Sequence, residues 1–189
     1  MKNSRLVSAR RVVGAVVAFV ATLVSLVAPA GAAHADPGDY VRMQNAETRQ
    51  YLTIGNANNG DGVPAIQWTS LSGSEQRWTF VKVHDVAGDY WDEWVIKNAH
   101  SGKCLAIPNG STADGAGAIQ WTCGTNPRGG EGIDDQRWLV TWDVILGGYL
   151  VHNFRSDKCL AIPAGNTTLG VQAIQWSCAN DLDQRWWLF

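Results

Sequence analysis

The side chains of this sequence that are best suited to bind a polar ligand are three tryptophans and three acidic residues. An indole face stacks on the apolar face of a sugar ring as readily as it packs in a protein core. The candidate indoles are Trp68, Trp121 and Trp176. The acids, each directly before a glutamine, are Glu75, Asp135 and Asp183. Such a carboxylate either accepts hydrogen bonds from ligand hydroxyls or caps its own turn.

Catalytic chemistry has much less support. His84, His100 and His152 occupy unrelated sequence contexts, and no Ser or Cys lies in a nucleophile motif. The carboxylate pairs Asp134–Asp135 and Asp181–Asp183 suggest glycoside hydrolysis, but both fall in turn-like segments where carboxylates are usually solvated. No metal-ligand spacing is present. We therefore predict a protein that is not an enzyme and has no cofactor or metal.

Residues 1–35 have the pattern of a secretory signal peptide. A basic head ending at Arg10-Arg11 precedes an apolar run from Val12 to Ala28, and Ala33-His34-Ala35 matches a cleavage site. The run is short for a membrane span. We therefore expect a secreted, extracellular protein made of residues 36–189.

The charge balance narrows the class of partner. Four of the 15 basic residues but none of the 17 acidic ones lie in the leader, so the remainder carries a net charge of −6. An acidic surface disfavours nucleic acid and anionic membranes. We therefore expect neither a nucleic-acid partner nor membrane insertion.

The rest of the chain is one unit repeated three times, at about residues 40–80, 93–140 and 149–189. Each repeat contains Ala-Ile-Gln-Trp and closes with Gln-Arg-Trp. Tyr51, Cys104 and Cys159 each stand 16 residues before the glutamine of the first motif. The step from that glutamine to the closing one is 9 residues in the outer repeats and 16 in the middle one. The middle repeat therefore carries a seven-residue insertion, within residues 124–133, which we expect to be a surface loop.

An all-β fold is indicated throughout the repeats. Tyr40 to Gln44, Glu93 to Lys97 and Tyr149 to His152 suit a first strand, and the Leu-x-Ile, Ile-Gln-Trp and Arg-Trp segments suit three more. Each repeat is too small to bury its own apolar face. We therefore predict three repeats of four strands sharing one core in a closed threefold barrel.

The closing motif is predicted to be structural. Alternation along a strand places its glutamine and tryptophan on one face. Trp78, Trp138 and Trp186 are therefore expected in the shared core. Gln76, Gln136 and Gln184 are expected to bond backbone in the closing turn, with ligand binding as the alternative. Asn45, Asn98 and Asn153 recur before turns and are expected to form them.

The cysteines are expected to form two disulfides. Cys104 and Cys123 stand in the second repeat where Cys159 and Cys178 stand in the third, which favours pairing within each repeat. Pairing between repeats remains open on cysteine number alone. Each bridge would add about 3 kcal/mol of stability. The first repeat has Tyr51 and Ser70 at these places and is expected to be looser.

These features together resemble the ricin-type lectin domain, a β-trefoil. The resemblance rests on the threefold repeat with Cys-Leu, a Gln/Trp strand, a second Cys and a closing Q-x-W, over residues about 40 to 189. It implies carbohydrate binding in a shallow pocket, often of galactose-based or xylan-like sugars.

The resemblance also implies which residues form the pocket. In that family an Asp directly after Cys-Leu accepts bonds from sugar hydroxyls, but here those positions are Thr53, Ala106 and Ala161. A glutamine and an aromatic residue follow on the third strand: Gln67-Trp68, Gln120-Trp121 and Gln175-Trp176. Because these are adjacent, either a bulge brings both to the pocket or one points into the core. The closing glutamine and the acid directly before it complete the set of candidate sugar-binding residues.

Three functions compete at this point. The leading hypothesis is a secreted carbohydrate-binding module with three weak sites acting by avidity. The alternative is a degenerate trefoil that has lost sugar binding and serves as a scaffold or binds a protein partner. A protease inhibitor presenting the loop at residues 124–133 is a third.

Overall fold

The computed structural model describes residues 40–83, 93–124 and 133–189, which all belong to one compact unit, Ala33–Phe189. The predicted signal peptide and residues 125–132 of the predicted insertion lie outside the described residues. The described elements are β-strands and short 3-10 turns, as the all-β prediction requires. In these ranges no helix is long and apolar enough to span a membrane.

Each repeat supplies four strands in the predicted order, except that Arg42 interrupts the first strand of the first repeat. The first repeat contains β1 (Tyr40–Val41), β2 (Met43–Asn45), β3 (Tyr51–Ile54), β4 (Val63–Trp68) and β5 (Trp78–Lys82). The second contains β6 (Glu93–Asn98), β7 (Cys104–Ala106), β8 (Ile119–Trp121) and β9 (Arg137–Asp143). The third contains β10 (Gly148–Asn153), β11 (Cys159–Ala161), β12 (Ile174–Trp176) and β13 (Trp186–Leu188).

Two 3-10 turns recur in every repeat, one after the second strand and one before the fourth. The first kind comprises η1 (Gly55–Ala57), η3 (Pro108–Gly110) and η5 (Pro163–Gly165). The second kind comprises η2 (Ser74–Gln76), η4 (Asp134–Gln136) and η6 (Leu182–Gln184). The middle residues of the first kind have positive φ values of 55°, 56° and 48°, which turn the chain sharply.

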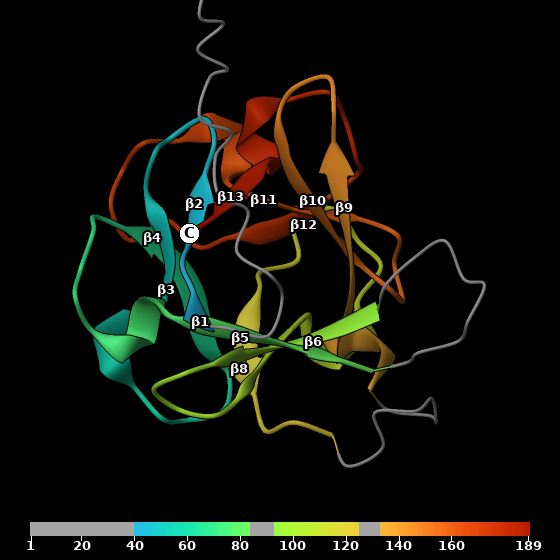
Figure 1. Ribbon diagram of the computed structural model, residues 1–189. Coiled ribbons are helices and arrows are strands. Elements are labelled where there is room, and N and C mark those ends of the chain that lie inside the picture. The colour runs from blue at the N-terminus through green and yellow to red at the C-terminus, as the bar shows by residue number, and fades with distance from the viewer. Residues whose placement is uncertain (1–39, 84–92, 125–132) are drawn as a thin grey trace, which may run out of the picture. The chain divides into compact units, whose positions relative to one another are not determined.

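The first and fourth strands of the three repeats close a barrel (Figure 1). The antiparallel pairs run around the ring as β1–β5, β5–β6, β6–β9, β9–β10, β10–β13 and β13–β2. Closure leaves no unpaired edge in this ring. The arrangement is the predicted β-trefoil with threefold pseudosymmetry.

The second and third strands form three hairpins, β3–β4, β7–β8 and β11–β12, that meet around the threefold axis. At the meeting point Ala65 N donates to Ala118 O, Ala118 N to Ala173 O, and Ala173 N to Ala65 O, at 3.0, 2.7 and 2.9 Å. All three alanines are fully buried. Their small side chains allow the three backbones to approach closely enough for this cycle.

The closing tryptophans lie in the shared core, as predicted. Trp78, Trp138 and Trp186 have no exposed surface. Each indole N–H donates to the carbonyl of a leucine in its own repeat: Leu52 at 3.1 Å, Leu105 at 2.9 Å and Leu160 at 2.9 Å. A buried indole needs such a partner, because an unsatisfied donor costs free energy.

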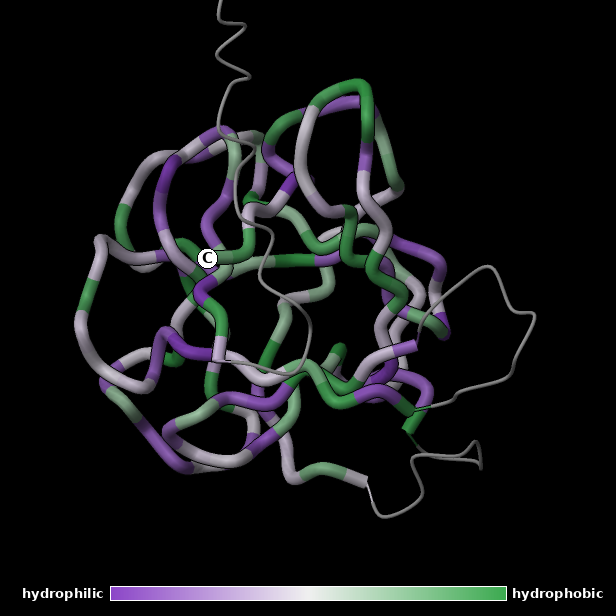
Figure 2. The backbone as a smooth tube through the Cα atoms, viewed as in Figure 1, coloured by the Kyte–Doolittle hydropathy of each residue, from purple (hydrophilic) through white to green (hydrophobic). Residues whose placement is uncertain are grey.

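Apolar residues also gather at one place outside the core. Figure 2 shows a hydrophobic stretch at the tip of the β9–β10 hairpin. Val144 and Ile145 at this tip are each 83% exposed.

The predicted disulfides are both present. Cys104 bonds to Cys123 and Cys159 to Cys178, each with a Cα–Cα distance of 5.1 Å. Both bridges lie within a single repeat.

Candidate functional site

Three pockets occupy equivalent places, one in each repeat. The first-repeat pocket has a volume of about 240 Å³, the second-repeat pocket about 490 Å³ and the third-repeat pocket about 360 Å³. Each is lined by a tryptophan from the third strand and by an acid from the turn before the fourth strand. The floor comes from the second strand. Three sequence-predicted elements therefore meet in each pocket.

The tryptophan walls are partly exposed. Trp68, Trp121 and Trp176 expose 36%, 46% and 46% of their surface. Each stands at the end of its strand, where alternation directs it away from the buried glutamine before it. No bulge is needed, because the strand sends the two neighbours to opposite faces.

A glycine from another repeat supports each indole. A β-carbon at Gly62 would lie 3.7 Å from Trp121 Cζ3, and the same relation holds for Gly115 with Trp176 and Gly170 with Trp68. The φ values of these glycines are +78°, +82° and +83°, in the region that disfavours other residues. Sequence reasoning missed this contact. The signal was available, since each glycine stands 11 residues after Tyr51, Cys104 or Cys159.

The glutamines paired with these tryptophans do not face the pockets. Gln67, Gln120 and Gln175 have no exposed surface, and none lines a pocket. Gln120 Nε2 donates to the carbonyls of Asn58 and Gly60 at 2.7 and 2.8 Å, and its Oε1 accepts from Ser101 Oγ at 2.7 Å. The structure thus gives these glutamines a role different from the predicted ligand contact.

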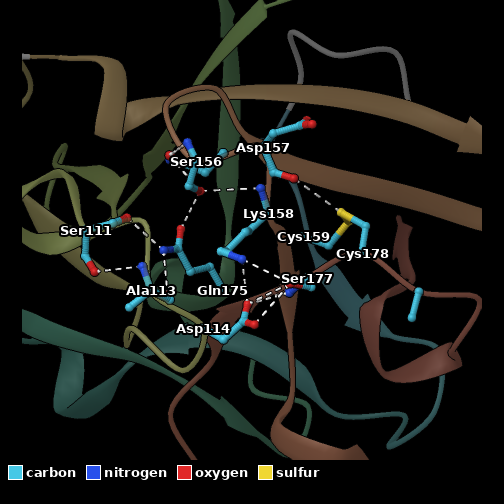
Figure 3. A network of polar contacts seen from close by, with 12 residues as sticks. Ser111, Ala113, Asp114, Ser156, Asp157, Lys158, Cys159, Gln175, Ser177 and Cys178 are labelled. Carbon is cyan, nitrogen blue, oxygen red and sulfur yellow. Dashed lines mark hydrogen bonds and ion pairs between the residues drawn. A yellow bond between two sulfur atoms is a disulfide. The ribbon is translucent and has the colours of Figure 1, made fainter.

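The same bonds occur at all three contacts between repeats. Gln175 donates to the carbonyls of Ser111 and Ala113 and accepts from Ser156 Oγ (Figure 3). Gln67 donates to the carbonyls of Asn166 and Thr168 and accepts from Thr48 Oγ1. Each glutamine therefore holds a loop of a different repeat, and the three contacts form a cycle.

The closing glutamines hold the rim of each pocket. Gln76, Gln136 and Gln184 are buried. Their Oε1 atoms accept from the amides of Leu71, Gly124 and Ala179, and their Nε2 atoms donate to the carbonyls of Thr69, Thr122 and Ser177. The predicted backbone bonding is confirmed, but the partners lie in the segment that follows the third strand and not in the closing turn itself. Gln136 and Gln184 also line their pockets.

Two of the acids that line these pockets have raised pKa values. Burial raises the pKa of Asp135, although the Gly110 amide and Arg155 act in the opposite direction. Burial also raises the pKa of Asp183, and the Asp181 carboxylate raises it further. The Oδ1 atom of Asp183 is buried and accepts no hydrogen bond within the described residues. Glu75 lines the first-repeat pocket at the equivalent place.

The pocket floors lack a carboxylate, as the sequence indicated. Thr53, Ala106 and Ala161 line the three pockets and are 3%, 1% and 1% exposed. Small or weakly polar floors leave recognition to the indole and to the acid on the rim.

One group of potential metal ligands lies close together in the described part of the chain. It consists of His152, Cys159 and Cys178. Both sulfurs belong to a disulfide and therefore offer no thiolate to a metal.

Family comparisons agree with this geometry. The model of the ricin-type beta-trefoil lectin domain matches residues 92–189, and that of the ricin-type beta-trefoil lectin domain-like family matches residues 32–121. The chain belongs to the ricin-type lectin family. Among curated proteins, sequence comparison finds no match to this ricin-type domain.

Solved structures with the same fold include designed and natural proteins. ThreeFoil, a designed threefold symmetric protein, is 30% identical with a TM-score of 0.66, over 79% of this chain and 96% of ThreeFoil. The exo-β-1,3-galactanase 1,3Gal43A of Clostridium thermocellum is 27% identical with a TM-score of 0.64, over 82% of this chain. The matched part is 30% of the galactanase chain.

A third structure shows the fold alone. The ricin B-like lectin of Macrolepiota procera, solved in complex with lactose, is 20% identical with a TM-score of 0.63. The match covers 82% of this chain and 97% of that lectin.

Proposed function

We propose that the chain is a secreted, non-catalytic carbohydrate-binding module with three weak sites. The observation that carries the proposal is the threefold recurrence of one pocket, lined in each repeat by a partly exposed indole, an acid and a small buried residue. The indole offers a stacking face for the apolar side of a sugar ring. The acid and nearby backbone groups offer partners for hydroxyls.

Individual sites are expected to be weak. A charged acceptor that bonds a ligand hydroxyl contributes about 1.5–3 kcal/mol, and the floor positions Thr53, Ala106 and Ala161 provide none. Three such sites on one domain gain affinity when they engage one polysaccharide together.

In the second repeat, the acids support binding rather than hydrolysis. Glycoside hydrolysis needs two available carboxyl groups. In the second repeat, Asp134 is ion-paired with Arg137 Nη1 at 2.9 Å, which leaves Asp135 as the pocket acid. The predicted leader and the two disulfides support an extracellular location. The acidic net charge supports a partner other than nucleic acid or an anionic membrane.

Retention on immobilised polysaccharides, together with a glycan array, tests the proposal. The wild-type protein is expected to be retained on at least one glycan, and Trp121→Ala and Trp176→Ala should each weaken retention. Trp142→Ala is the matched control, because Trp142 is 42% exposed but lines none of the three pockets. A folded protein that no glycan retains would refute the proposal.

The alanine floors favour one second candidate, a trefoil that has lost sugar binding and acts as a scaffold or binds a protein. Ala106→Asp and Ala161→Asp restore the carboxylate that the family carries. If galactose binds only to these variants and the wild-type chain binds no glycan, the second candidate is correct.

A further inference from the structure

One surface position beside each pocket differs in charge among the three repeats. Asn45, Asn98 and Asn153 form the predicted turns, and each Oδ1 accepts from the amides two and three residues later. The residue two positions after the asparagine is therefore held in the same way in every repeat. These rim residues are Glu47, His100 and Arg155.

The same asparagines attach each rim residue to the pocket of another repeat. Asn45 Nδ2 donates to the carbonyl of Asp183 at 2.7 Å, and Asn153 Nδ2 donates to the carbonyl of Asp135 at 2.9 Å. Asn98 Nδ2 reaches the carbonyl of Glu75 at 2.9 Å. Each asparagine thus bonds the main chain of a pocket acid.

The rim side chains lie against the turn that borders the pocket. A β-carbon at Gly165 would lie 2.8 Å from Glu47 Cγ, and one at Gly110 would lie 2.6 Å from Arg155 Nε. Arg155 Nε also donates to Gly110 O at 2.8 Å. The backbone amides of Gly110 and Gly165 lie close enough to Asp135 and Asp183, respectively, to lower the pKa of those carboxyl groups. Glu47 and Arg155 therefore occupy matching places beside the third-repeat and second-repeat pockets.

The third-repeat pocket gathers negative charge, and the one arginine beside it in the described ranges is already paired. Asp181 and Asp183 line it, and Glu47 stands at its rim. Arg185 lies behind it but is 1% exposed and ion-paired with Asp143 at 2.7 Å.

We propose that the third-repeat pocket selects a sugar that carries a protonated amino group, of the glucosamine type. The proposal rests on the proposed function. The ammonium group is attracted by the carboxylates of Asp183, Asp181 and Glu47, while the sugar ring stacks on Trp176. Hydrogen bonds between charged partners are about twice as strong as neutral ones. The second-repeat pocket has the same floor and an equivalent indole, but Arg155 at its rim disfavours a cationic ligand.

A titration with two matched probes tests this selectivity. The probes are a glucosamine trisaccharide with free amino groups and its N-acetylated counterpart, which has the same backbone without charge. The indole N–H resonances of Trp176 and Trp121 report the two pockets separately. At Trp176 the charged probe is expected to bind at least about tenfold more tightly than the neutral one, and at Trp121 it should show no such preference.

Charge reversal at the rim provides the matched variants. Glu47→Arg should abolish the preference at Trp176 while leaving N-acetylated trisaccharide binding in place, because Glu47 does not line the pocket. Asp183→Asn should also abolish the preference, and it should weaken both probes because Asp183 lines the pocket. Arg155→Glu should create a preference at Trp121. Trp176→Ala, followed by calorimetry because the variant lacks the reporting indole, should lose the tighter binding of the charged probe if that binding occurs in the pocket. General attraction between an acidic protein and a cationic sugar would persist in this variant.

The outcomes distinguish this inference from the proposed function. Equal affinity of the two probes at Trp176, or a preference that survives Glu47→Arg and Asp183→Asn, overturns the inference and leaves carbohydrate binding intact. Binding of neither probe at Trp176 overturns the inference. Absence of binding to every glycan on the array overturns the proposed function as well.

Discussion

The first repeat and the other two close the same corner of the fold by different chemistry. The second and third repeats use a disulfide, whereas the first has Tyr51 and Ser70 at those places. Arg42 takes over the connection there. Its Nη2 donates to Ser70 Oγ at 2.9 Å and to Gln76 Oε1 at 2.8 Å, and its guanidinium lies 3.9 Å from the centre of the Tyr51 ring.

The second repeat shows what Arg42 replaces. Val95 stands at the position of Arg42 and packs against the disulfide of Cys104 and Cys123. A valine suits an apolar sulfur bridge, and an arginine suits a hydroxyl and an aromatic ring. The first repeat is therefore a differently closed repeat rather than one with a missing part. The comparison shows that equivalent places in the repeats are cross-linked in each case, but by a disulfide in one repeat and by side-chain contacts of an arginine in another.

The largest effect is expected in the core, where the repeats do not differ. Trp78→Ala, Trp138→Ala and Trp186→Ala should each lower the free energy of unfolding by about 3–5 kcal/mol, because a fully buried indole is replaced by a cavity. Chemical denaturation of the three variants measures this. A much smaller loss of unfolding free energy for Trp78→Ala than for the other two variants would show that the first repeat is loosely packed. That result would contradict the idea that Arg42 replaces the disulfide there.

The disulfides should contribute the next largest effect. Replacing Cys104 and Cys123 together by serine should cost about 3 kcal/mol, and the same change at Cys159 and Cys178 should cost a similar amount. Both bridges span 19 residues and restrict the unfolded chain equally. Denaturation without reductant measures the loss. Clearly unequal losses would contradict the equivalence of these two repeats.

Arg42 should contribute a smaller amount that is confined to the first repeat. Arg42→Ala removes two hydrogen bonds and the contact with Tyr51, for an expected loss of about 1–2 kcal/mol. Arg77→Ala is the control, because Arg77 is exposed and should change stability by less than about 0.5 kcal/mol. Equal stability of both variants would mean that nothing replaces the disulfide in the first repeat.

The smallest effect is expected from the ion pairs between repeats. Asp61 pairs with Lys103, and Asp114 pairs with Lys158, each at 2.8 Å, whereas Leu169 stands at the equivalent place of the third contact. The hydrogen bond from the lysine holds the pKa of each aspartate below its ordinary value of 3.8. Their stabilisation is therefore complete well above pH 3.8 and is lost as the pH falls through the lowered pKa.

Asp61→Asn and Asp114→Asn test this pH dependence. Each should lower the melting temperature slightly at neutral pH, and the difference from wild type should shrink as the pH falls below 3.8. Leu169→Asn is the control for the third contact, where no pH-dependent difference is expected. A difference that stays constant down to acidic pH would show that the carboxylate charge is not what stabilises these contacts.

Much of the fold could be predicted because the residue spacings that indicate it are short and occur in all three repeats. The equal spacing of Cys104 with Cys123 and of Cys159 with Cys178 indicated the pairing, and strand alternation placed Trp138 inside. The interruption of the first strand at Arg42 was not predicted. At Arg42 the chain passes from pairing with β5 to pairing with β13, and both partners are distant in the sequence.

The candidate site was harder to predict than the fold. Alternation showed that Gln120 and Trp121 face opposite ways, but hydropathy favours burying the tryptophan. The structure buries the glutamine, because the carbonyls of Asn58 and Gly60 in another repeat require its amide. The rim residues Glu47 and Arg155 escaped prediction for the same reason, since each borders a pocket of a different repeat.

The cycle of glutamine contacts determines the order in which these contacts can form during synthesis. The loop held by Gln120 precedes it in the chain, as does the loop held by Gln175, whereas Gln67 holds Asn166 and Thr168, about a hundred residues later. During synthesis the first two contacts have both partners as soon as each glutamine is made. The amide of Gln67 emerges long before its acceptors and stays hydrated until the third repeat is complete. The contact of Gln67, in the first repeat, with Asn166 and Thr168 is therefore the last of the three that can form.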